Sequence, residues 1–183
     1  MSSVTCIIDG REVTAPEGTM LLKAAREAGI EIPSLCHDDR LEPSGACRLC
    51  MVEITKNGRR RLVASCCYPV EDGLEVRTDT EELLKIRRMI IELLWPSLEG
   101  LGKKYGVTQS RFKPSHTDCS MCGLCVRYCA EITKRHAVYF AGRGVDREIA
   151  LVPEMAAQCM YCGECFNLCS GGWIVNEMNN IYA

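Results

Sequence analysis

Two stretches decide the fold: Cys119-Ser120-Met121-Cys122-Gly123-Leu124-Cys125-Val126-Arg127-Tyr128-Cys129 and, forty residues later, Cys159-Met160-Tyr161-Cys162-Gly163-Glu164-Cys165-Phe166-Asn167-Leu168-Cys169. Both follow the pattern C-x2-C-x2-C-x3-C, and glycine occupies the same place in each copy, at Gly123 and Gly163. Repetition of a whole ligand pattern indicates a duplicated metal-binding unit.

The spacing within each run indicates which cysteines share a cluster. A short loop around a cubane presents three thiolates to three corners and cannot reach the fourth corner without strain, so the fourth cysteine serves the other cube. The first predicted [4Fe–4S] set is Cys119, Cys122, Cys125 and Cys169. The second is Cys159, Cys162, Cys165 and Cys129. Structural zinc also uses paired C-x2-C motifs, but this three-plus-one spacing fits zinc poorly.

Cysteine is the unusual component of the composition. The chain has 14 cysteines among 183 residues, whereas its 47% hydrophobic residues, 25% charged residues and net charge of −2 are ordinary. Disulfide-rich scaffolds are secreted, but the N-terminus shows no secretory signal. No stretch is long and apolar enough to span a membrane, and no basic excess suggests nucleic acid. We therefore expect a cytoplasmic metalloprotein.

A third group of cysteines lies in the first half of the chain. Its spacing is Cys36-x10-Cys47-x2-Cys50, followed by Cys66 or Cys67. Plant-type ferredoxins have four residues between the first two ligands, so this is a different version of the motif. Four thiolates in one domain suit a [2Fe–2S] cluster, with two sulfurs on each iron.

Turn residues and hydrophobic periodicity give a coarse secondary structure. Strands are expected at residues 4–8, 12–14, 51–54, 61–64 and 73–76, with a hairpin turn at Asp9-Gly10. Thr19 is expected to cap a helix that extends to about residue 28. A second helix is expected at residues 79–94, ended by Pro96. Its predicted apolar face comprises Leu83, Ile86, Ile90, Leu93 and Leu94.

These elements predict an α+β protein in three parts. Residues 1–78 form a β-grasp [2Fe–2S] ferredoxin domain, residues 79–118 a helix and covering linker, and residues 119–183 a bacterial-type two-[4Fe–4S] ferredoxin domain.

The front domain carries a specific resemblance. The segments are Ile32-Pro33-Ser34-Leu35-Cys36-His37, Gly45-Ala46-Cys47-Arg48-Leu49-Cys50-Met51-Val52-Glu53 and Leu62-Val63-Ala64-Ser65-Cys66-Cys67-Tyr68-Pro69-Val70. They resemble the N-terminal part of the large iron–sulfur subunit of respiratory complex I. They also resemble the diaphorase iron–sulfur subunit of NAD-linked [NiFe] hydrogenases and the N-terminal arm of [FeFe] hydrogenases. The run from Cys119 to Arg127 matches the next module of that family.

The resemblance implies ligands and a function. It makes Cys66 the fourth [2Fe–2S] ligand and leaves Cys67 as a spare, packed thiol. It implies an electron-transfer subunit between an NAD(H)-linked flavoprotein and a second redox subunit, either an NADP-type flavoprotein or a hydrogenase, or a ferredoxin. The short form suits electron-bifurcating complexes. The family usually has a His-x3-Cys-x2-Cys-x5-Cys cluster between the two modules, and this chain lacks it; His116 should not be taken for a ligand.

The remaining candidates have simpler roles. Cys6 is expected in the core, and His37 near the surface. Arg48 and Arg127 lie inside ligand loops, and three roles are open for them: raising the potential of a cluster, meeting a partner, or a solvated position. Trp173 and Phe166 are expected to pack in the core. No catalytic dyad or nucleotide-binding glycine motif is present, so we expect no catalytic site in the chain itself. The alternatives are a diffusible polyferredoxin and a zinc-stabilised scaffold.

Overall fold

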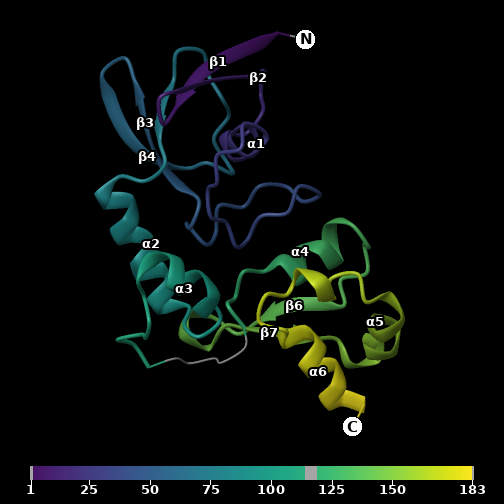
Figure 1. The fold of residues 1–183 in the computed structure, drawn as a ribbon. Helices are drawn as coiled ribbons and strands as arrows, with labels where there is room; N and C mark the ends of the chain where they lie inside the picture. Colours follow the sequence, from purple (N-terminus) through teal and green to yellow (C-terminus); the bar gives the residue numbers. More distant parts are fainter. Residues whose placement is uncertain (1, 114–118, 183) are drawn as a thin grey trace.

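The computed structural model describes residues 2–113 and 119–182, and His116 lies outside this range. The class is mixed α+β, as the sequence predicts. In Figure 1 the N-terminal sheet lies apart from the C-terminal part, and the loop between α1 and β3 lies next to α4. No helix in the described residues is long and apolar enough to cross a membrane.

The front domain is built on one five-stranded sheet in the order β2-β1-β5-β3-β4. The strands are β1 (Ser3–Ile8), β2 (Arg11–Pro16), β3 (Met51–Lys56), β4 (Arg59–Ala64) and β5 (Glu75–Arg77). Strand β5 pairs in parallel with β1 and antiparallel with β3, which joins two hairpins into one sheet. The first hairpin turns at Asp9 and Gly10, whose φ values of 49° and 79° are those of a type I′ turn.

Helix α1 (Leu21–Glu27) completes the core of this domain. Its buried residues are Leu21, Leu22, Ala24 and Ala25, and they share a cluster with the inward residues of the sheet. Cys6 is buried in that cluster, so its predicted core role is confirmed. Thr19 was predicted to cap α1, and this prediction was wrong by one residue. Met20, paired with Pro69 in an isolated bridge, is the N-cap and offers no side-chain hydrogen bond.

Helix α2 (Glu81–Leu93) begins at Thr80, whose hydroxyl accepts from the Leu83 amide. The predicted apolar face was partly wrong. Ile91 is fully buried, whereas Leu93 is 57% exposed. Arg87 is also buried, because its guanidinium supplies donors to three backbone carbonyls of the front domain.

The predicted linker contains a further helix, α3 (Glu99–Tyr105), which packs against α2. The sequence analysis assigns this segment to a linker, so the helix was not predicted. Gly102 is nevertheless required by packing, since a Cβ there would lie 2.6 Å from the Val107 carbonyl oxygen and 2.8 Å from the Trp95 ring. Tertiary contact thus overrides low helix propensity.

The C-terminal part has a smaller core. Its elements are α4 (Leu124–Glu131), β6 (Val138–Ala141), β7 (Glu148–Leu151), α5 (Ala156–Cys162) and α6 (Trp173–Tyr182). Short 3₁₀ turns lie at Gly144–Asp146, Pro153–Met155 and Phe166–Leu168. Strands β6 and β7 form an antiparallel pair. Trp173 and Phe166 pack against the buried residues of this core, which confirms their predicted place.

Candidate metal centres

The front cysteines lie on loops around one end of the sheet. Cys36 and Cys47 are in the long loop before β3, Cys50 directly precedes β3, and Cys66 follows β4. The Sγ atoms of Cys50 and Cys66 are 3.4 Å apart, and the Cys47 amide donates to the Cys36 Sγ at 3.3 Å. The four thiols therefore form two pairs, which suits a [2Fe–2S] cluster in which each iron takes two thiolates.

Within each pair, the contact between the two thiols lowers the pKa of one and raises the pKa of the other. A hydrogen bond from the Cys47 thiol lowers the pKa of Cys36 to about 5, and one from Cys66 lowers the pKa of Cys50 to about 6. The pKa values of Cys47 and Cys66 are raised by the same contacts and by burial. A bound cluster would require all four cysteines as thiolates, because thiolates are the form that binds metal.

Cys67 differs from its neighbour in exposure. Cys66 is buried, whereas Cys67 is exposed, with its Sγ 3.5 Å from the Cys66 Sγ. The prediction that Cys67 is packed was therefore wrong. The chain reverses direction directly after β4, and this turn directs the Cys66 side chain inward and the next one outward.

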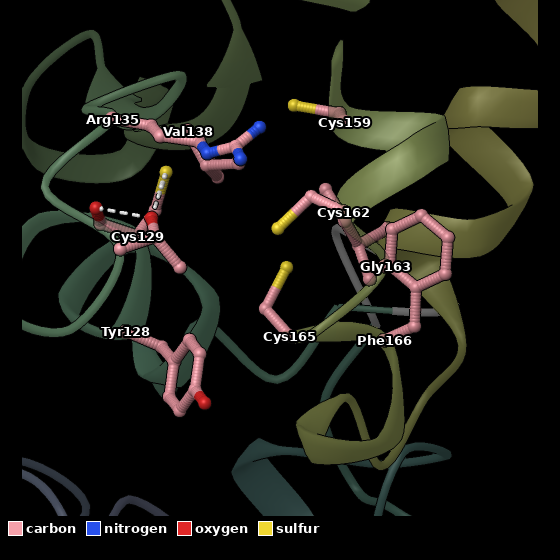
Figure 2. Close-up of a pocket in the computed structure, with 11 residues that line it drawn as sticks. Tyr128, Cys129, Arg135, Val138, Cys159, Cys162, Gly163, Cys165 and Phe166 are labelled. Atoms are coloured by element: carbon pink, nitrogen blue, oxygen red, sulfur yellow. Dashed lines mark hydrogen bonds between the residues drawn. The ribbon is translucent and has the colours of Figure 1, made fainter. Parts of the chain in front are cut away.

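Cys129 lies opposite the second cysteine run. One cavity is lined by Cys129, Cys159, Cys162 and Cys165. In Figure 2 the sulfur atoms of the last three point toward the side where Cys129 lies. The Cys129 Sγ accepts hydrogen bonds from the Ala137 amide at 3.2 Å and, more weakly, from the Thr133 hydroxyl at 3.8 Å. Helix α4 thus presents Cys129 to the distant run, and the loop from α4 to β6 donates hydrogen bonds to its sulfur.

The predicted complementary set comprises Cys119, Cys122, Cys125 and Cys169. Burial raises the pKa of Cys119, and the charges of Cys122 and Cys169 raise it further. Burial likewise raises the pKa of Cys125, with Cys122, Cys165 and Cys169 adding to the effect. Cys119, Cys125 and Cys169 all pack in the same C-terminal core, which brings Cys169 near the first run. Gly123 and Gly163, with φ values of 74° and 56°, make the same left-handed turn in each copy.

The thiol sets fit iron–sulfur clusters in number, burial and backbone hydrogen bonding. In residues 2–113 and 119–182, no three histidine, cysteine, aspartate or glutamate side chains converge as a site for a single metal ion. His37 is not placed among the thiols as a ligand would be; its Nε2 lies 2.9 Å from the Asp39 carboxylate.

The front set and the first C-terminal set are neighbours. A groove between them is lined by Cys47 and Ala46 on one side and by Met121 and Cys122 on the other. The charge of Cys36 contributes to the raised pKa of Cys122, after burial and the charge of Cys169. A cluster held by the front cysteines would therefore lie close to a cluster held by the first C-terminal cysteines.

Two arginines contribute to the site: Arg87 was not identified from the sequence, whereas Arg127 was identified without its partners. Arg87 fixes α2 to the backbone on both sides of Cys50, through the carbonyls of Leu49 and Met51. Arg127 reaches the Cys36 carbonyl from α4, rather than solvent. Its position between two ligand cysteines is the only sequence signal that points to such a role.

Comparison with known proteins gives a family match for the front domain and relatives for almost the whole chain. Residues 1–81 match a family described as a 2Fe-2S iron–sulfur cluster binding domain. The NADPH-Fe(3+) oxidoreductase subunit alpha of Geobacter sulfurreducens is 32% identical over 95% of this chain and 24% of its own length. The NADP-reducing hydrogenase subunit HndD of Solidesulfovibrio fructosivorans is 30% identical over 97% of this chain and 37% of its own. The chain thus spans about a quarter to a third of these relatives.

A solved structure extends the similarity to the fold. It is the crystal structure of an NAD+-reducing [NiFe]-hydrogenase in the H2-reduced state. The superposition has a TM-score of 0.71 at 30% identity and covers 82% of this chain and 76% of the other.

Proposed function

Because the chain belongs to the family of iron–sulfur subunits of NAD(P)-linked oxidoreductases and hydrogenases, we propose that it relays single electrons between two redox partners. One partner is a flavoprotein subunit with an NAD(H) site. The other is an NADP-type flavoprotein, a hydrogenase subunit or a ferredoxin. Iron–sulfur clusters supply one-electron redox chemistry when bound, and the chain's own residues hold, space and shield them.

The ligands form three sets in this proposal. The β-grasp domain of residues 1–78 holds [2Fe–2S] on Cys36, Cys47, Cys50 and Cys66. The ferredoxin domain of residues 119–183 holds two [4Fe–4S] clusters, on Cys119, Cys122, Cys125 and Cys169, and on Cys159, Cys162, Cys165 and Cys129. Residues 79–118 connect the two domains. The observation that carries the proposal is the cavity in which Cys129 faces the run from Cys159 to Cys165.

The neighbouring positions of the thiol sets support an order. The groove shared by Cys47 and Cys122 favours the [2Fe–2S] site beside the first [4Fe–4S] site. The second [4Fe–4S] site is then terminal. Beside it, Tyr161 is 93% exposed and Met160 45% exposed. Large exposed side chains of this kind are typical of contact surfaces, which favours a hetero-oligomeric subunit over a diffusible polyferredoxin.

Electron bifurcation and a cytoplasmic location belong to the same proposal. They are supported by the thiol-rich chain and by relatives whose names include both NADPH-linked and NADP-reducing proteins. Bifurcation requires a partner flavin, since this chain has no nucleotide-binding motif of its own.

The test is anaerobic purification of the native complex, with subunits identified and flavin, iron and labile sulfide counted. We expect about ten iron atoms per chain and an accompanying flavoprotein. A brown, flavin-free chain that purifies alone would support the diffusible polyferredoxin instead. A colourless, zinc-loaded protein would refute both iron–sulfur alternatives.

A further inference from the structure

Arg127 connects the two cluster-binding domains. It lies two residues after Cys125 and two before Cys129 in α4, so its backbone is anchored between proposed ligands of both [4Fe–4S] clusters. Its side chain is only 18% exposed and leaves the helix toward the loop that carries Cys36. Arg127 therefore links helix α4 of the C-terminal domain directly to the loop that carries Cys36 in the front domain.

The guanidinium uses its donors on that loop. Nη1 donates to the Cys36 carbonyl oxygen at 3.2 Å and to the Ser44 hydroxyl at 3.1 Å, and Nη2 donates to the Glu42 carbonyl oxygen. Nε donates to the Glu131 carboxylate at 3.2 Å, and the other oxygen of that carboxylate accepts from the Glu42 amide at 3.0 Å. Arg127 and Glu131 together hold the loop from both its carbonyl and its amide side.

Ser44 continues this network to sulfur. Its hydroxyl oxygen lies 3.6 Å from the Cys36 Sγ and can donate to it. A hydroxyl that accepts a hydrogen bond from a cation becomes a stronger donor, because hydrogen bonds in a chain polarise one another. Hydrogen bonds to a ligand sulfur stabilise the negative charge that reduction adds.

We propose that Arg127 is a positioning residue for the [2Fe–2S] centre, acting through Ser44 on the Cys36 sulfur. It fixes the hydroxyl in its donating orientation and adds positive charge beside it, so the reduction potential of the front centre depends on a residue of the C-terminal domain. Glu131 offsets part of the charge, which leaves the Ser44 hydrogen bond as the main route. This inference rests on the proposed function.

Arg40 offers a matched comparison at the same interface. Its guanidinium lies 4.8 Å from the centre of the Tyr128 ring and donates to the Tyr128 hydroxyl at 3.2 Å, so it also joins the loop to α4. It pairs with Asp38 and makes no contact with Ser44 or the Cys36 sulfur. Arg40→Gln therefore removes the same charge and an interdomain contact while leaving the network intact.

The experiment is an anaerobic redox titration of the holoprotein, followed by the EPR signal of the [2Fe–2S] centre. Arg127→Gln should lower the equilibrium constant for reduction about tenfold, which is 59 mV for a one-electron couple. Ser44→Ala should give most of that shift, and the double variant should shift little further. Arg127→Lys should recover only part of it, because a point charge cannot reproduce the planar set of donors.

The outcomes separate the two proposals. A wild-type holoprotein without a [2Fe–2S] signal would refute the proposed function itself. A normal signal whose midpoint is unchanged in Ser44→Ala, or shifts equally in Arg40→Gln and Arg127→Gln, would overturn the role of Arg127 and leave the function standing. Where Arg127→Gln fails to retain the cluster, the Ser44→Ala midpoint decides.

Discussion

Replacing Arg87 by methionine tests how α2 is attached to the front cluster loop. The side chain is 2% exposed, and burial lowers its pKa. Its hydrogen bonds reach the carbonyls of Thr78 at 2.6 Å, Met51 at 2.9 Å and Leu49 at 3.3 Å. Methionine fills similar space but leaves these three carbonyls without that donor.

The expected magnitude follows from two opposing contributions. An unsatisfied buried carbonyl costs about 1–3 kcal/mol, so three would cost several kcal/mol. Removing a buried charge returns part of this, because the guanidinium no longer has to be desolvated. We expect a net loss of about 3 kcal/mol, a large share of an ordinary domain's stability of about 5–15 kcal/mol.

The assay is urea unfolding of the holoprotein under anaerobic conditions, followed by far-ultraviolet circular dichroism. With a slope of about 2 kcal/mol per molar urea, the midpoint should fall by about 1.5 M. Visible absorbance should also be lost faster, since two of the three carbonyls flank Cys50. Arg88→Met is the control, because that side chain is on the exposed face of the same helix and reaches only the Tyr105 carbonyl, at 3.1 Å. Equal midpoints for the two variants would refute the reasoning.

The other predictions concern ligands and one turn. Cys66→Ser should abolish the [2Fe–2S] EPR signal, whereas Cys67→Ser, altering an exposed thiol, should retain it. Cys129→Ser should deplete the [4Fe–4S] cluster of the distant run, because its sulfur lies in that cavity; iron analysis and EPR of the holoprotein would measure the loss. Gly142→Ala should lower the thermal midpoint by several degrees, because the new Cβ would lie 2.2 Å from a backbone carbonyl oxygen at a φ of 67°. Gly144→Ala, also at positive φ but with nothing within 4 Å, should cost only about 1–2 kcal/mol, the penalty of an L-residue in the left-handed conformation, and so should lower the thermal midpoint less.

Each of these has a result that would contradict it. Retention of the front signal in Cys66→Ser, with loss in Cys67→Ser, would exchange the two assignments. Loss of the cluster of the nearer run in Cys129→Ser would refute the crossed ligand sets. Equal thermal midpoints for Gly142→Ala and Gly144→Ala would contradict the expected clash and show that the turn moves to relieve the contact at Gly142.

The parts of the fold that local chemistry controls were predictable. The Asp9-Gly10 turn, the paired strands and helix α2 (Glu81–Leu93) all follow from residues adjacent in sequence. The gathering of Cys129 with Cys159 and its neighbours followed from cubane geometry, which the spacing encodes.

The features that the sequence did not predict share one cause, because each depends on contacts with residues distant in sequence. Arg87 looks like a solvent-facing position until the carbonyls of Leu49 and Met51 are brought to it. Arg127 acts on a loop more than eighty residues earlier in the chain. Helix α3 exists because Gly102 lets the chain approach Trp95 closely, and no periodicity within the segment reports that contact.

The crossing of Cys129 and Cys169 has a consequence for biosynthesis. With the proposed ligand sets, neither [4Fe–4S] site has its fourth thiol until the second run has left the ribosome. A nascent chain that has reached only residue 158 carries only four of the eight cysteines in these two ligand sets and can complete neither cubane. With these ligand sets, the two [4Fe–4S] sites can be completed only after Cys165 and Cys169 have been made, whereas the front [2Fe–2S] site, complete by Cys66, can be filled earlier.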